Sequence, residues 1–199
     1  MEIDRNDSII EAKIGQRPIT FCYAFNAKND EVVRMASANR VGTRTSQFSM
    51  GSKSTPENLS QRVETLMETA DWGVAMIHGI TCGYDAFKKD SVLWDHLEKV
   101  KAKEDSIWVG TFKDVAAYAA ERDAIGLNVD RKGNRFTVVP TLALDKKLFD
   151  RPLTMVVDLR GIRKLKVNQS GKLLAVTISA DKALFDFDPY GGAVYVWVF

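Results

Sequence analysis

The sequence has few of the residues that most often carry metal or redox chemistry. Among its 199 residues are two histidines, His78 and His96, and two cysteines, Cys22 and Cys82. Two cysteines without C-x-x-C spacing cannot build a disulfide framework, so we expect two semi-buried thiols. The histidines fall on different expected elements and lack H-x-x-x-H spacing. Because a zinc site needs about three protein ligands, we expect this chain to bind no metal by itself.

Several other classes of protein are disfavoured by what is missing. The net charge is only +2, from 28 basic and 26 acidic residues, and no basic stripe with interleaved aromatics occurs, so we expect no nucleic-acid partner. Apolar runs stay well below the roughly 18–20 residues that span a bilayer, so we expect no membrane span. The acidic, amphipathic start lacks the order of a signal peptide, and localisation stays open. Nucleophile-elbow and phosphate-loop motifs are also absent.

The first part of the chain, up to about Gly126, alternates between helical and strand-like patterns. The clearest helix begins after Thr55, an expected N-cap, with Pro56 at its first position. Short apolar runs at residues 18–25, 72–80 and 106–112 predict buried strands. Strands and helices in regular alternation favour parallel βα units.

After residue 126 the hydrophobic pattern changes to a period of two. Alternating segments flank a turn at Lys132-Gly133-Asn134 and another at Ser170-Gly171. About seven short strands separated by turns are typical of an antiparallel β-sandwich. We therefore expect two domains, residues 1–126 and residues 127–199.

Sequence stretches in the first part carry a family resemblance. "WGVAMIHGI" places His78 at the end of an expected strand with Met76 two residues before it, and "ITFCYAFNAKND" places Phe25 at another strand end. Together with "NRVGTR" and "IWVGTFKDVAAYAAER", they resemble the later motifs of the polysaccharide deacetylase family. These metal-dependent enzymes remove acetyl groups from chitin-like and peptidoglycan-like polymers. The resemblance implies an incomplete (β/α) barrel of the deacetylase type, followed here by the small antiparallel β-sandwich.

The chain departs from the family pattern at its metal-binding motifs. The paired aspartates of the first motif and the closely spaced histidines of the second do not occur, as if the chain began in the helix after the second motif. The third motif, usually Arg-x-Pro-aromatic, keeps only the aromatic Phe25. The resemblance therefore implies zinc in the full-length family but a truncated form here, inactive on its own. Such enzymes usually work outside the cytoplasm.

His78 is the candidate catalytic residue. An imidazole at the carboxyl end of a parallel strand can give a proton to a leaving amine or alkoxide, which is the general-acid role that the resemblance implies. The alternative is a histidine that closes a strand and hydrogen-bonds to a neighbouring loop. We take Phe25, Tyr84 and Met76 as candidate substrate-binding residues for a carbohydrate polymer, and we assign no metal ligand.

A second hypothesis is a non-catalytic carbohydrate-binding or structural module. Its basis is the aromatic content of the β-rich part, with Tyr190, Tyr195 and Trp197, since exposed aromatic rings on a sheet can stack on sugars. A barrel without its first strands would also expose sheet edges and apolar surface. We therefore expect either a homodimer or a rearranged, closed edge. The truncated form that the resemblance implies would instead be completed by a complementing N-terminal chain.

Overall fold

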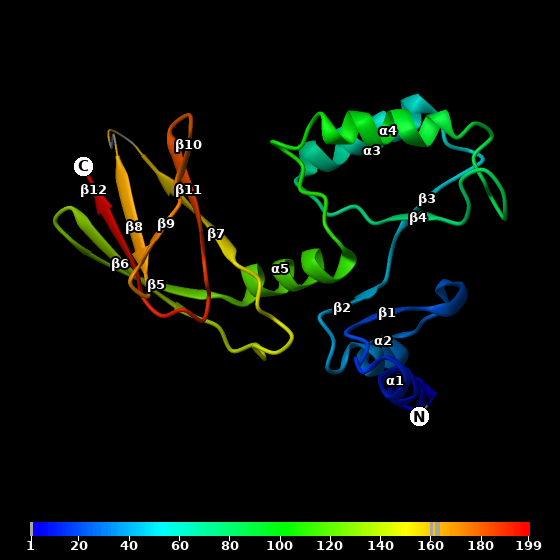
Figure 1. Ribbon diagram of the computed structural model, residues 1–199, viewed down its shortest axis with the longest axis horizontal. Helices are drawn as coiled ribbons and strands as arrows, with labels where there is room; N and C mark the ends of the chain where they lie inside the picture. The colour runs from blue at the N-terminus through cyan, green and yellow to red at the C-terminus, as the bar shows by residue number, and fades with distance from the viewer. Residues whose placement is uncertain (1, 160, 162–163) are drawn as a thin grey trace. The chain divides into compact units, whose positions relative to one another are not determined.

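Five α-helices, one short 3-10 helix and twelve strands make up the described part of the computed structural model, which covers residues 2–159, 161 and 164–199 (Figure 1). The α-helices are α1 (Glu2–Ile14), α2 (Asp30–Ser37), α3 (Pro56–Thr69), α4 (Ser91–Lys101) and α5 (Phe112–Ala124), with one short 3-10 helix, η1 (Ala24–Asn26). The strands are β1 (Thr20–Cys22), β2 (Gly42–Arg44), β3 (Phe48–Met50), β4 (Ala75–Ile77), β5 (Gly126–Lys132), β6 (Arg135–Thr141), β7 (Leu153–Asp158), β8 (Leu165–Gln169), β9 (Lys172–Leu174), β10 (Thr177–Ser179), β11 (Lys182–Phe187) and β12 (Val194–Val198). No helix among these residues combines the length and the apolar character that crossing a bilayer demands.

The chain divides into two compact units that interrupt each other in sequence. The first unit contains Met1–Phe21, Asn29–Thr43 and Lys113–Phe199. The second contains Cys22–Lys28 and Arg44–Phe112.

Two antiparallel sheets form the β-rich part of the first unit. One sheet has the strand order β5-β6-β12-β8-β9 and the other the order β10-β11-β7. The β5-β6 and β8-β9 hairpins turn at the positions predicted from the sequence, and their register is antiparallel throughout. Ser170 and Gly171 both have positive φ, at 51° and 79°, as a tight primed turn requires. These two hairpins confirm the period-two pattern.

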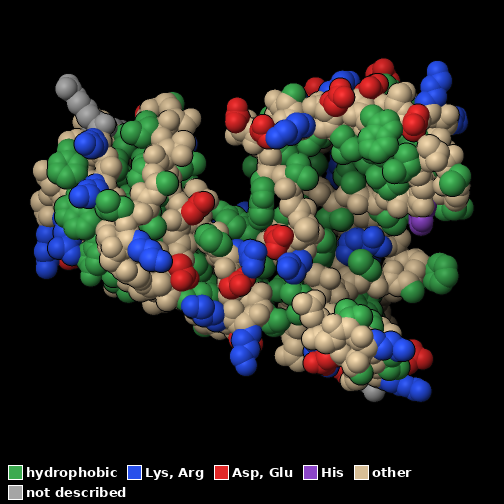
Figure 2. Space-filling model, in the orientation of Figure 1, with side chains coloured by type: hydrophobic (Ala, Val, Ile, Leu, Met, Phe, Trp, Pro, Cys, Tyr) green, Lys and Arg blue, Asp and Glu red, His purple; other side chains and the backbone are tan. Residues whose placement is uncertain are grey.

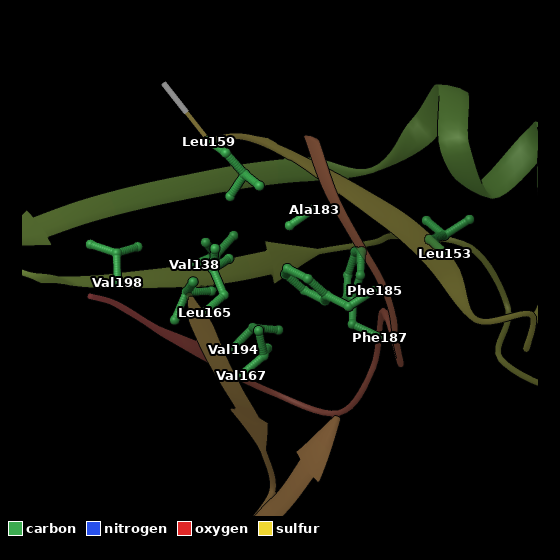
Figure 3. Packing of buried hydrophobic residues seen from close by; sticks show 11 residues of the cluster. Val138, Leu153, Leu159, Leu165, Val167, Ala183, Phe185, Phe187, Val194 and Val198 are labelled. Carbon is green, nitrogen blue, oxygen red and sulfur yellow. The ribbon is translucent and has the colours of Figure 1, made fainter. Parts of the chain in front are cut away.

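The core of the first unit lies between these two sheets. Val194, Val196 and Val198 alternate along β12 and are buried, while Phe185 and Phe187 come from β11 of the other sheet. Figure 3 shows Phe185 and Phe187 pointing from β11 toward Val194 and its neighbours in the other sheet. Alternation therefore gives β8, β11 and β12 one buried face and one outer face.

Asp7 of α1 and Arg40, which follows α2, form a buried ion pair in the same unit. Both side chains are only 3% exposed. The Arg40 guanidinium also donates to the carbonyl oxygens of Ala36 and Ala38, at 3.0 and 3.4 Å. Burial of a paired charge with further hydrogen bonds makes this contact costly to break.

Glu121 on α5 is a buried carboxylate whose partner is a backbone amide. The residue is fully buried, and the N–H of Arg151 donates to its two carboxylate oxygens at 3.0 and 3.2 Å. Burial raises the pKa of Glu121 above its ordinary value of 4.5; the hydrogen bond from Arg151 opposes this shift, and the negative charge of Asp150 adds to it.

The raised pKa of Glu121 predicts a pH-dependent stability. Its contribution is fully present below pH 4.5 and is lost as pH rises through the higher pKa of the folded state. Relative to Glu121→Gln, the wild-type free energy of unfolding should therefore increase as pH falls from neutral toward 4.5. Denaturant unfolding across this range measures the difference, with exposed Asp123→Asn as the control. A constant gap between wild type and Glu121→Gln would contradict this assignment.

The second unit contains a small parallel sheet and two packed helices. Strands β3 and β4 pair in parallel, with Met50 opposite Ile77 at the last position of the register. The buried residues Met50, Leu59, Phe87 and Leu93 form its core. They come from β3, from α3, from the segment after β4 and from α4, so this core holds both strand ends against the helix pair.

The fold class expected from the sequence, an incomplete (β/α) barrel followed by an antiparallel β-sandwich, is wrong. In the described residues the early strands form two separate two-stranded sheets, β1-β2 and β3-β4, and no barrel is closed. The expected strand at 106–112 is absent, and its Trp108 and Val109 are 56% and 73% exposed. Strands of only three residues bury too little surface to build a continuous parallel sheet. The chain has a mixed α/β fold instead.

Candidate functional site

The candidate site lies where the parallel strands β3 and β4 end. Since Met50 and Ile77 are paired, the residues that follow them, Gly51 and His78, leave the sheet at the same edge. The carboxyl ends of parallel strands are where α/β folds most often place binding and catalytic groups. This edge therefore brings the loop after β3 and the loop after β4 together.

Ser52 and Asp85 connect these two loops. The backbone N–H of Ser52 donates to Oδ1 and to the backbone oxygen of Asp85, at 3.1 and 3.2 Å. The Ser52 hydroxyl donates to the same Oδ1 at 2.5 Å. A Cβ on Gly51 would lie 2.1 Å from the backbone oxygen of Asp85, so only glycine allows this close approach. Three hydrogen bonds thus hold Asp85 over the end of β3.

Asp85 is held as a carboxylate by this network. The hydrogen bond from the Ser52 hydroxyl lowers its pKa most, and the Ser52 amide lowers it further. Positive charge on His78 and Lys53 lowers the pKa of Asp85 as well, by smaller amounts. Asp85 therefore provides a fixed negative charge beside His78 rather than an exchangeable proton.

His78 and Tyr84 form an aromatic pair at the same edge. Their ring centroids are 5.1 Å apart and their planes meet at 84°, an edge-to-face arrangement. Tyr84 is 80% exposed. His78 is exposed as well. Both rings can therefore contact a ligand from solvent.

An open hollow of about 500 Å³ lies beside the aromatic pair. Its lining consists of Ser49, Gly51, Ser52, Lys53, Tyr84 and Asp85. This lining includes an aromatic ring together with hydroxyl, ammonium and carboxylate groups. Such a mixture suits a polar ligand with an apolar face, as sugars have.

The structure brings together two of the four residues predicted for the site. His78 and Tyr84 are in contact. Met76 lies half-buried in β4, opposite Ser49, and it is not part of the hollow's lining. Phe25 is fully exposed in η1 with a φ of 53°, and it does not line the hollow either. The substrate-binding roles of Met76 and Phe25 stay predictions.

Three site residues, Ser52, Lys53 and Asp85, were missed by the reasoning from sequence. The "FSMGSKST" stretch places small and polar residues directly after a three-residue apolar strand, which is a pattern that could have marked Ser52 and Lys53. Asp85 lies among turn residues, and only the folded loop shows that it faces Ser52.

The donor set of this site does not fit zinc. In the part of the chain that the structure describes, no three His, Cys, Asp or Glu side chains converge on one point. His78 and Asp85 are two potential ligands, and Asp85 is already bound to Ser52. A zinc ion needs about three protein ligands, and these two side chains do not provide them. Cys22 and Cys82 are both exposed free thiols, and the expected semi-buried placement is wrong.

Comparison with known proteins does not assign a family. No family model matches the chain, and no curated protein matches it. An α-fucosidase of Thermotoga maritima in complex with a mechanism-based inhibitor is similar over 77% of this chain and 39% of its own, with 15% identity and a TM-score of 0.27. The same fucosidase with fucose gives 14% identity and a TM-score of 0.25, over 77% of this chain and 39% of its own. The chain spans less than half the length of these structures, and likeness this low carries no argument about fold or activity.

Proposed function

We propose that this chain is a polysaccharide deacetylase-type protein that binds an acetylated carbohydrate polymer in the hollow beside His78 and Tyr84. The observation that carries the proposal is the edge-to-face pair of His78 and Tyr84 at the carboxyl end of β4. Ring faces carry partial negative charge, so the C–H groups of a sugar pack well on Tyr84. Ser52, Lys53 and Asp85 supply polar groups for the sugar hydroxyls.

His78 is the proton donor in this proposal. When an acetamido group is hydrolysed, water adds to the acetyl carbon, the C–N bond breaks, and the departing sugar amine takes a proton. An imidazole that packs against Tyr84, a residue of the hollow's lining, can supply that proton. The carboxylate of Asp85 provides a negative charge near this imidazole.

The chain alone should bind the polymer without hydrolysing it. Its described side chains provide a proton donor and a binding surface but no set of ligands that fits a zinc ion. The partner that this proposal requires is a complementing polypeptide, or a second copy of the chain, that contributes the missing ligands. Zinc-dependent acetate release by this chain alone would contradict this part of the proposal.

Isothermal titration with tetra-N-acetylchitotetraose tests the binding. We expect saturable binding by the wild type and an affinity about twofold to twelvefold lower for Tyr84→Ala, since one aromatic contact contributes about 0.5–1.5 kcal/mol. Trp94→Ala is the matched control, because Trp94 is a 48% exposed aromatic of the same unit that does not line the hollow. A flat titration, or equal losses in the two variants, would overturn the proposed site.

A further inference from the structure

The outer face of the five-stranded sheet carries an unusual arrangement of cations. Trp197 lies opposite Arg135 of β6 on one side and opposite Lys166 of β8 on the other. Lys132 of β5 lies opposite Arg135 in turn. Directly paired residues share a face of the sheet. Lys132, Arg135 and Lys166 therefore form a row across this face, here called the cation row. Trp197 lies between Arg135 and Lys166.

The aromatic rings of β12 hold the centre of the cation row in place. The guanidinium carbon of Arg135 lies 4.5 Å from the ring centre of Tyr195 and 5.6 Å from that of Trp197. The two rings are 6.2 Å apart on the same face. Cation–π contacts of this kind fix an arginine side chain before any ligand binds. The row is therefore centred on an ordered guanidinium.

The positive charge of the row is largely uncompensated. Lys132 lies 3.6 Å from Asp130, the neighbouring carboxylate on the same face. Neither Arg135 nor Lys166 forms an ion pair with any carboxylate of the described residues. Like charges directly opposite each other, as Lys132 and Arg135 are, destabilise a sheet. An anionic ligand would remove this repulsion.

The surroundings of the row favour a carbohydrate as the anionic ligand. The next pairs on the same face place Thr137 and Asn168 on either side of Tyr195, and both can hydrogen-bond to hydroxyl groups. Figure 2 shows blue basic side chains standing among green hydrophobic ones over this β-rich part, at the left of the view. A nucleic acid needs open ring faces on which to stack its bases, and Arg135 already lies over both rings.

We propose that this outer face binds an acidic polysaccharide, whose sugar carboxylates contact the cation row. Arg135 offers the planar donor pair that a carboxylate accepts, and Lys132 and Lys166 add charge on either side. This site lies on the first unit and uses none of the residues of the hollow beside His78. It is therefore independent of the proposed deacetylase-type function.

Affinity electrophoresis of the full chain in gels that contain polygalacturonate tests the proposal. We expect retardation by polygalacturonate at low ionic strength and none by its fully methyl-esterified form, which has the same backbone without the charges. The double variant Arg135→Gln/Lys166→Gln should bind at least tenfold more weakly and should unfold at the same denaturant concentration. Lys182→Gln, an exposed change on β11 of the other sheet, is the matched control and should bind like wild type.

Four outcomes would overturn this inference. One is equal retardation by the charged and esterified polymers, and another is unchanged binding by the folded double variant. Tighter binding to a single-stranded RNA oligonucleotide than to polygalacturonate would assign the face to nucleic acid instead. Light scattering that shows a dimer, reduced to a monomer by the double variant, would assign it to a second copy. Tyr84→Ala should leave polygalacturonate binding unchanged, which keeps this test separate from that of the hollow.

Discussion

Replacing Asp7 with alanine is expected to lower the free energy of unfolding by about 3–5 kcal/mol. The change leaves the Arg40 guanidinium buried without its carboxylate partner, since that side chain is only 3% exposed. Its two carbonyl acceptors, on Ala36 and Ala38, do not neutralise the charge. Arg17 also lies 3.6 Å from the Asp7 carboxylate. Because Arg17 is itself cationic, it cannot neutralise Arg40 once Asp7 is removed. Denaturant unfolding at neutral pH measures the loss.

The same helix provides the control for this prediction. Glu11 pairs with Arg17 at 3.3 Å, but its side chain is 50% exposed. Exposed ion pairs contribute roughly 0.2–1 kcal/mol, so Glu11→Gln should cost little. Similar losses for Asp7→Ala and Glu11→Gln would show that Asp7 is not a buried partner of Arg40.

Phe185→Ala is expected to cost about 3–5 kcal/mol of unfolding free energy. Phe185 is 2% exposed and comes from β11 into the core that the two sheets of the first unit share (Figure 3). Removal of its ring leaves a cavity among valines of β12 and β8, which are held by their own strand pairings and cannot close over it. Thermal or denaturant unfolding of the whole chain measures the change.

Ile178→Ala is the matched control for Phe185→Ala. Ile178 lies on β10 of the same three-stranded sheet and is 53% exposed, so its truncation should cost less than about 1 kcal/mol. If both variants unfold at the same denaturant concentration, Phe185 does not fill the core as described.

The β-rich part of the fold was predictable because its information is local. Gly133 and Ser170-Gly171 mark tight turns, and the alternation of Val194, Val196 and Val198 marks the buried face of β12. A hairpin joins two strands that are adjacent in sequence, so the turn residues and the two-residue hydrophobic period suffice to predict it. The order of the strands in the sheets depends on contacts between distant segments, and no local pattern predicts it.

The early part was mispredicted because alternation of helices and strands does not determine which strands pair. The run at 72–80 contains only the three-residue strand β4, which pairs with β3 at 48–50, a segment not expected to be a strand. The run at 106–112 stays outside any sheet. Apolar residues close to a helix can look like a buried strand when only their hydrophobicity is considered.

Two residues of the candidate site were predictable for the same local reason. His78 and Tyr84 lie six residues apart in one loop, so a strand-end histidine and a following aromatic could be paired from the sequence. Asp85 and Ser52 are 33 residues apart. Their contact depends on the parallel pairing of β3 with β4 and on the absence of a side chain at Gly51, which became visible only in the folded structure.

The most direct test of the binding site beside His78 is a nuclear magnetic resonance titration of the full chain with tetra-N-acetylchitotetraose. We expect saturable shifts at the His78 imidazole, at the Tyr84 ring and at the Ser52 amide, which lie at one edge of the β3-β4 sheet. The imidazole of His96 on α4 is the internal control and should not shift. Shifts confined to other parts of the chain, or equal shifts at the two histidines, would contradict the assignment of this hollow as the sugar-binding site.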